Sequence, residues 1–147
     1  MHPEAPASEP DRVLMQARVL WLALLAGPLA LFGVIAFLIA TGKLPPSDDE
    51  QVKRMLAWLS GAVLLILVPM AYLLRRHIHG HVRAANPEAP LPGRVLLRGQ
   101  IAFGALCEAA ALVGLVAAIG RGTLMPTGLL ALVAIGVQAA NFPARVD

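Results

Sequence analysis

The sequence has few charged residues, few aromatic residues and a single cysteine. Aspartate, glutamate, lysine and arginine make up 14% of its 147 residues, and the aromatic residues make up 5%. Because Cys107 is the only cysteine, an intramolecular disulfide is excluded and the redox compartment cannot be inferred from cysteine pairs. The chain also lacks a plausible Ser/His/Asp set, an HExxH motif and a phosphate-binding glycine loop. We therefore expect a non-enzymatic protein without a cofactor.

Apolar residues, at 58%, are in excess of what a soluble globular chain carries. They gather in four stretches that reach or approach the ~20 residues needed to cross a bilayer core. These are residues 19–40, 55–74, 101–119 and 124–142. The first is too long for the ~7–15-residue apolar core of a cleaved signal peptide. The pattern predicts an all-α membrane protein, a four-transmembrane-helix bundle of two antiparallel hairpins. We expect a disordered tail over residues 1–15 and a single transmembrane domain over 16–147, with a cytoplasmic loop at 75–100.

The basic residues are unevenly divided between the two ends of these segments. Arg12, Arg18 and Arg145 lie on the same side as the loop 75–100, which carries five further arginines. By the positive-inside rule this side is cytoplasmic, which predicts cytoplasmic termini in a multi-pass protein of the bacterial inner membrane. We call the five loop residues the arginine collar and expect them to contact anionic lipid headgroups: Arg75, Arg76, Arg83, Arg94 and Arg98. Nucleic acid is not an expected partner, since no stacking aromatics are interleaved with these residues.

Small residues recur at helical spacing in the third and fourth apolar segments. Such residues let membrane helices approach closely and pack through van der Waals contact. The pattern predicts that the third helix is the packed centre, and that the protein self-associates or docks in a larger membrane complex. The expected packing residues are Gly104, Ala110, Gly114, Ala118, Gly136 and Ala140.

One carboxylate, Glu108, lies near the middle of the third apolar segment. Holding a glutamate neutral at pH 7 costs about 3.7 kcal/mol, which is close to the ~2.5–3.5 kcal/mol penalty for a charge at a helix centre. We therefore expect a protonated side chain that hydrogen-bonds to another helix. The candidate partners are Ser60, Gln138 and the carbonyl group that Pro28 leaves without a donor. Alternatively, a lone membrane carboxylate is typical of a proton or cation site.

Two resemblances bear on this carboxylate. The segment GALCEAAALVGLV at 104–116 resembles the ion-carrying helix of the rotary ATP synthase c subunit, and RAANPE at 83–88 is similar to that family's polar loop with two extra alanines. This resemblance implies that Glu108 carries an ion. Gly27-Pro28, Glu108 and Phe142-Pro143 together resemble small four-helix bacterial integral membrane proteins. That resemblance implies the four-helix architecture and supplies no catalytic residue.

Three histidines, His77, His79 and His81, follow the second apolar segment. If the segment is helical, His77 and His81 share a face; if it is extended, all three share one. Their imidazoles could bind a transition metal or sense pH, or could simply add to the arginine collar at the lipid headgroups. The leading expectation for the whole chain is a structural or accessory membrane protein. A proton- or cation-translocating oligomer comes second and a metal or pH sensor third.

Overall fold

The computed structural model describes the backbone of residues 9–85 and 93–143 and the side chains of 12–84 and 93–143. This part of the chain holds four helices and no strand, which confirms the all-helical prediction. The helices are α1 (Glu9–Ala40), α2 (Glu50–Ala85), α3 (Gly93–Arg121) and α4 (Thr127–Ala140). α1 and α2 continue through Pro28 and Pro69, respectively, without interruption.

Helices extend into two regions that were expected to lie outside the membrane-spanning helices. α1 begins at Glu9, inside the tail 1–15 that was expected to be disordered, and α2 and α3 occupy most of the expected loop 75–100. The thickness of the bilayer sets the length of the apolar segment but not the length of the helix. The helix can continue into polar sequence until residues such as proline end it. The three prolines Pro87, Pro90 and Pro92 lie in the gap between α2 and α3. Residues 1–8, 86–92 and 144–147, which include Asn86–Glu88 of the c-subunit-like loop and Arg145, lie outside the described residues.

Three of the helices, α1, α2 and α3, are long and apolar enough to cross a membrane. With 32, 36 and 29 residues they each exceed the length that a bilayer core requires. α4 is shorter than the expected span 124–142: its 14 residues begin after Pro126. At 1.5 Å per residue it extends about 21 Å, against the ~30 Å of hydrocarbon. α4 therefore packs among longer helices without the length of a full span.

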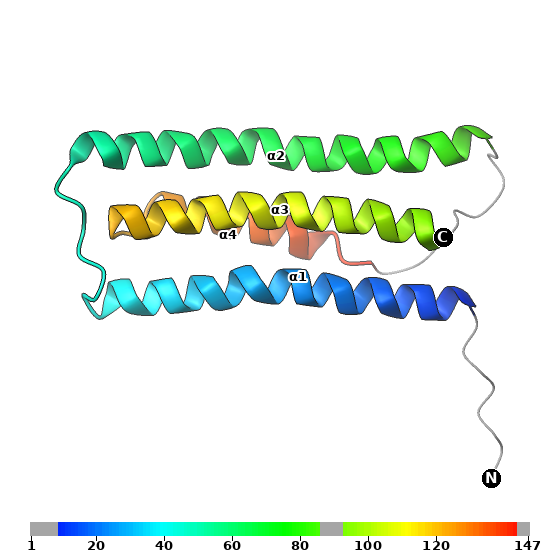
Figure 1. The fold of residues 1–147 in the computed structure, drawn as a ribbon, viewed down its shortest axis with the longest axis horizontal. Helices are drawn as coiled ribbons and strands as arrows, with labels where there is room; N and C mark the ends of the chain where they lie inside the picture. The colour runs from blue at the N-terminus through cyan, green and yellow to red at the C-terminus, as the bar shows by residue number, and fades with distance from the viewer. Residues whose placement is uncertain (1–8, 86–92, 144–147) are drawn as a thin grey trace, which may run out of the picture.

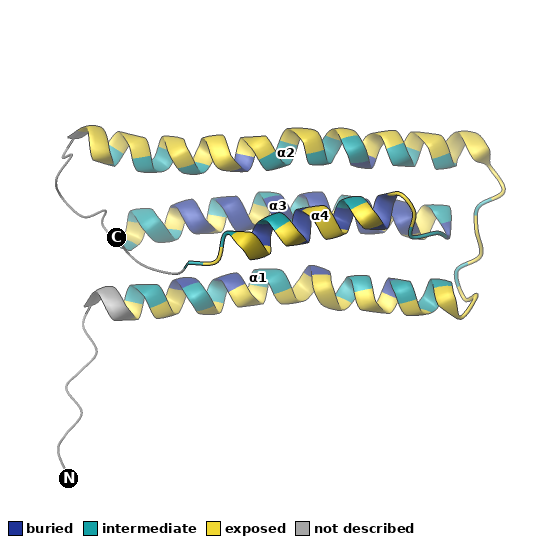
Figure 2. Cartoon of the chain, turned by 180° about the vertical axis from the view of Figure 1, so that it is seen from behind, coloured by how far each residue is buried: buried dark blue, intermediate teal, exposed yellow. Residues whose placement is uncertain are grey.

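The helices are arranged around α3. Figure 1 shows α3 between α1 and α2, with α4 overlapping it, and the described parts of α1 and α2 contact α3 and α4 but not each other. Half of the apolar span of α3 is buried (50%), against 11% in α1 and in α2. Figure 2 shows the same contrast, since buried residues are concentrated in α3 and are sparse in α1 and α2. α3 is thus the packed centre of the molecule, and α1 and α2 present long apolar faces to the surroundings.

Small residues of α3 allow α4 to approach closely. A Cβ added at Gly114 would lie 2.9 Å from the backbone oxygen of Thr127 and 3.1 Å from the backbone nitrogen of Ala131. Ala110 and Ala118 are buried at 2% and 0% exposure. Ala118 packs with residues from three helices, namely Ile35, Leu115 and Ala131. Gly136 and Ala140 of α4 were also expected to pack against another helix. In the structure both residues are exposed, and a Cβ added at Gly136 would meet nothing within 4 Å. The spacing of small residues repeats in α4, but its buried face is formed by other positions.

We expect Gly114→Ala to lower the free energy of unfolding by about 1–3 kcal/mol, because the backbone atoms of α4 that the methyl group meets cannot rotate away. Gly136→Ala is the matched control and should be neutral or slightly stabilising, since alanine favours helix more than glycine. Cys107 is fully buried and is the only cysteine, so its labelling by a thiol-reactive dye on heating reports unfolding. Equal unfolding midpoints for the two variants would contradict the close α3–α4 approach.

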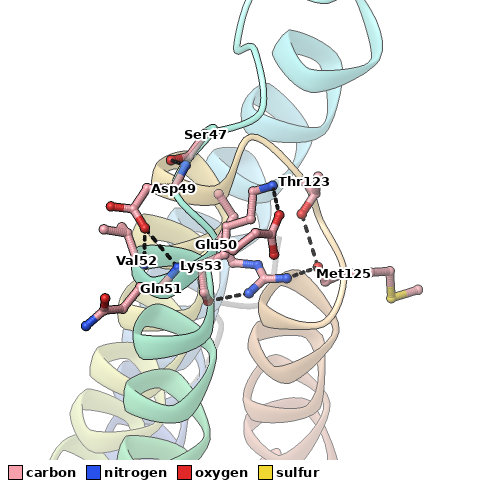
Figure 3. A network of polar contacts seen from close by, with 9 residues as sticks. Ser47, Asp49, Glu50, Gln51, Val52, Lys53, Thr123 and Met125 are labelled. Carbon is pink, nitrogen blue, oxygen red and sulfur yellow. Dashed lines mark hydrogen bonds and ion pairs between the residues drawn. The ribbon is translucent and has the colours of Figure 1, made fainter.

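The α1–α2 loop packs against the α3–α4 turn at one end of the molecule. The Ser47 backbone N–H donates to the Arg121 carbonyl at 3.3 Å, and Arg121 donates through its guanidinium to the carbonyls of Lys53 and Met125. Asp49 caps α2 by accepting from the backbone N–H groups of its second and third residues at 2.8 and 3.1 Å. Figure 3 shows part of this network, with the Asp49 cap at the start of α2 beside the turn that carries Thr123 and Met125. The contacts of Arg121 join the connection between α1 and α2 to the central helix.

Candidate functional site

Glu108 lies near the middle of α3 on the side that faces α1. Its carboxyl oxygen Oε1 is 3.6 Å from the position that a Cβ at Gly27 would take, so the group rests against the bare backbone of α1. The side chain is partly exposed. No hydrogen bond or ion pair joins Glu108 to any other group in the described ranges 12–84 and 93–143. The carboxyl group therefore lies at a helix–helix contact with hydrogen-bonding capacity to spare.

The three predicted partners of Glu108 differ in their surroundings. The Ser60 hydroxyl is 1% exposed and donates to the carbonyl of Ala57 within its own helix. Gln138 is fully buried, and neither polar atom of its side-chain amide has a hydrogen-bond partner among the described residues. Pro28 is buried next to Gly27. Gly27, which precedes Pro28, is the residue that lies beside the carboxyl group.

Gln138 belongs to the same part of the interior. Its amide Nε2 would be 3.8 Å from a Cβ at Gly104, which precedes Glu108 by one helical turn on α3. On the other side, Gly104 approaches α1, where Leu24 would be 2.9 Å from the same Cβ. The carboxyl of Glu108 and the amide of Gln138 thus lie within about one turn of each other along α3, and neither has a partner among the described residues.

One flank of α3 is not covered by any described helix. Ala105, Leu112 and Val116 are exposed there, the last at 61%. At 100° per residue these positions lie together, and Glu108 lies between them and the α1-facing Gly104. The carboxyl group is therefore at the edge of an apolar flank that is open to whatever surrounds the molecule.

A second polar group of residues lies at the end where α4 stops. Asn141 links three elements: its Oδ1 accepts from Arg75 Nη1 at 3.2 Å, and its Nδ2 donates to the Tyr72 hydroxyl and to the Val137 carbonyl, both at 2.8 Å. Its backbone oxygen accepts from Gln100 Nε2 at 2.9 Å. We call this set the Asn141 cluster. It connects α2, α3 and the end of α4 through one residue, by its side chain to α2 and by its backbone oxygen to α3.

Two carbonyl groups at and just after the end of α4 accept hydrogen bonds from side chains of α1. Trp21 of α1 donates to the Gln138 carbonyl at 3.1 Å, and Arg18 donates to the Pro143 carbonyl at 3.3 Å. A helix leaves its final carbonyls without intrahelical donors, and such groups are costly in an apolar environment. Sequence reasoning missed this role. The available signal was the pair of amides Gln100 and Asn141 at the ends of apolar segments.

The arginine collar divides into one inward and four exposed residues. Arg75 donates to Asn141 and its Cζ lies 5.6 Å from the centre of the Phe103 ring, so it takes part in helix packing and does not simply face lipid headgroups as expected. The other four residues are exposed: Arg76, Arg83, Arg94 and Arg98. These remain the candidates for contact with anionic lipid.

The three histidines do not converge on one point. His77 and His81 lie on one exposed face of α2 with their Nε2 atoms 3.0 Å apart. His79 points instead toward α3, where its Nε2 would be 2.5 Å from a Cβ at Gly99. Burial lowers the pKa of His79, and the charges of Arg75 and Arg83 lower it further. The described residues contain no group of three or more His, Cys, Asp or Glu placed to hold a metal. The predicted three-histidine site is therefore split into a pair and a packed single residue.

Cys107 belongs to the packed interior. It is fully buried beside Ala71 and Phe103, with Leu106 and Val137 around this cluster. The other residues of this cluster are apolar, so none of them can act as a base or bind a metal. Comparisons with protein-family models, with curated proteins and with solved structures find no match to this chain.

Proposed function

We propose that this chain is a non-enzymatic structural protein of the bacterial inner membrane that self-associates through the open flank of α3, by itself or within a larger membrane complex. Three helices long and apolar enough to cross a membrane support the location. The observation that carries the proposal is the carboxyl group of Glu108, which lies at the edge of that flank without a partner among the described residues.

A second copy of the chain is the partner that fits this group. In hydrocarbon an unpaired polar group is expensive, and polar side chains join membrane helices by hydrogen bonding. A protonated carboxyl group both donates and accepts, so two copies of Glu108 related by a twofold axis satisfy each other. The flanking Ala105 is small and permits close approach of the two α3 helices. Glu108 is then a protonated interhelical donor, in agreement with the expectation from the sequence.

The proposed orientation follows from the basic residues. α1 begins, α2 ends and α3 begins at one end of the molecule (Figure 1), and that end carries the four exposed residues of the arginine collar together with Arg12. The positive-inside rule places it in the cytoplasm, where anionic headgroups contact the arginines. The opposite end carries Asp49 and Glu50 beside Lys53, which pairs with Glu50 at 2.6 Å. The termini are cytoplasmic in this orientation.

A second candidate function is proton or cation translocation by an oligomer, with Glu108 as the titrating group. The observation in its favour is the buried amide of Gln138, whose two polar atoms have no partner in the part of the chain that the structure describes. Such a group can hold a water molecule between Glu108 and the polar end of α4. The likeness of residues 104–116 to the c-subunit helix implies the same role for the carboxylate.

Disulfide crosslinking between copies tests the leading proposal. In a Cys107→Ser background, Ala105→Cys places a thiol on the open flank of α3, and we expect oxidant to yield a covalent dimer in native membranes. Leu65→Cys, on an exposed face of α2 (75% exposed), is the control and should yield little dimer. Adding Glu108→Leu should abolish the Ala105→Cys crosslink, whereas Glu108→Gln should retain part of it, because the amide still hydrogen-bonds.

Two results would contradict self-association through this flank. One is equal crosslinking at Ala105→Cys and Leu65→Cys. The other is crosslinking at Ala105→Cys that is unaffected by Glu108→Leu. Reconstitution in vesicles with an internal pH dye distinguishes the second candidate: proton flux that is lost in Glu108→Gln while the crosslink persists favours translocation.

A further inference from the structure

We propose that His77 and His81 form a two-imidazole binding site for a divalent transition-metal ion at the polar end of α2. The site is independent of the function proposed above. It lies on α2, whereas Glu108 lies on α3, and it uses none of the residues of the open α3 flank. It takes a borderline cation such as Zn²⁺, Ni²⁺ or Cu²⁺, with water completing the coordination sphere.

The spacing of the two nitrogens fits a shared metal ion. The Nε2 atoms of His77 and His81 are 3.0 Å apart, and the ring centroids are 4.2 Å apart with planes at 85°. Two imidazole nitrogens each about 2.0–2.1 Å from one metal are separated by roughly 2.9 Å at 90° and 3.4 Å at a tetrahedral angle. The observed separation lies in that interval, so a rotation of the two exposed rings that turns both Nε2 lone pairs toward one ion is enough for chelation.

The surroundings provide access and room for water. Both histidines are exposed, and they border an open groove of about 390 Å³ lined by Leu73, Arg76, His77, Gly80 and His81. A Cβ added at Gly80 would meet nothing within 4 Å, so no side chain crowds the groove at that point. Both histidines follow the apolar segment 55–74, on the part of α2 that continues beyond it. The site is therefore accessible to ions from the aqueous phase.

Metal binding requires a proton rearrangement that the pair can make. The two Nε2 atoms lie within hydrogen-bond distance, a contact in which one ring donates its Nε2–H to the other. Coordination uses both Nε2 lone pairs, so the donating ring must carry its proton on Nδ1 instead, and each ring remains neutral. A ring that is protonated before binding releases one proton to solvent. No electron transfer is involved.

Two neighbours define the limits of the site. His79 is directed toward Gly99 on α3 and is not a third ligand. Arg76 lines the groove and carries a positive charge that opposes cation binding, although solvent and salt weaken this effect at an exposed position. With two protein ligands and a nearby cation, we expect weaker binding than at a complete four-ligand site, with copper bound more tightly than nickel or zinc.

Isothermal titration of the full chain in lipid nanodiscs with Zn²⁺ and with Ni²⁺ tests this site. The protein carries a purification tag without histidine and the substitution His2→Ala, which removes the remaining histidine of the chain. We expect one saturable site per chain. His77→Ala and His81→Ala should each weaken binding by at least about tenfold, because the second imidazole binds within a chelate. His79→Ala should bind as the parent does.

Two matched variants make the test specific for the pair. Combining His81→Ala with Val82→His keeps the number of histidines but moves one ring off the shared face, and it should bind no better than His81→Ala. Arg76→Gln should raise the affinity by up to severalfold. Binding that survives loss of both His77 and His81, or that falls as much in His79→Ala, would overturn the assignment. Absence of saturable binding to the parent at millimolar metal would also overturn it.

Discussion

Replacing Gly122 by alanine is expected to lower the free energy of unfolding by roughly 2–5 kcal/mol, the largest effect of any single substitution considered for this chain. Two costs combine at this position. Gly122 has φ +64°, where a residue with a Cβ is disfavoured by ~1–2 kcal/mol. In addition, its Cβ would lie 2.3 Å from the Pro45 carbonyl oxygen and 2.4 Å from the Pro46 Cα. These are backbone atoms, so the two loops must separate.

Gly42→Ala isolates the first of these costs, the conformational one. Gly42 has φ +69° but meets nothing within 4 Å of an added Cβ, so its substitution carries the conformational cost alone, about 1–2 kcal/mol. The measurement is the unfolding transition in mixed micelles, followed by labelling of Cys107. The difference between the two variants gives the energetic cost of pushing the Gly122 turn away from Pro45 and Pro46. If both variants lose equal stability, the α1–α2 loop does not pack against the α3–α4 turn.

Asn141→Leu is expected to destabilise the protein by about 2–3 kcal/mol, because each lost hydrogen bond contributes about 1 kcal/mol. The substitution removes the acceptor of Arg75 and the donor to Tyr72 and to the Val137 carbonyl. Arg75 is partly buried at this point, so its guanidinium loses a partner that solvent replaces only in part. The Gln100 bond is made to the Asn141 backbone and should remain.

A double-mutant cycle separates the contacts of the Asn141 cluster. Tyr72→Phe removes one hydrogen bond on an exposed residue and should cost less than about 1 kcal/mol alone. In an Asn141→Leu background it should cost nearly nothing, since the partner is already absent. Additive losses would show that Asn141 and Tyr72 act independently, and would contradict the cluster as described.

The structure changes the interpretation of the polar residues more than that of the apolar ones. Arg75 and Trp21 are residue types that favour the membrane–water interface, and each lies at the end of an apolar segment. The sequence therefore suggests that both contact lipid headgroups. In the structure both donate to groups at the end of α4, to Asn141 and to the Gln138 carbonyl respectively. No local pattern indicates such a role, because the need arises only when a short helix ends among longer ones and its carbonyl groups require donors.

The sequence by itself determined the helical class, the three long apolar helices and the isolated carboxylate. These depend on composition and on runs of apolar residues, which act locally and require no partner helix. Only the tertiary structure decided that α4 is a short helix, that Gly136 is exposed while Gly114 is packed, and that His79 is separated from His77 and His81. Where a helix is apolar on all sides, hydrophobicity cannot distinguish the side that faces lipid from the side that faces another helix. Close packing makes that distinction, and packing depends on which backbones meet.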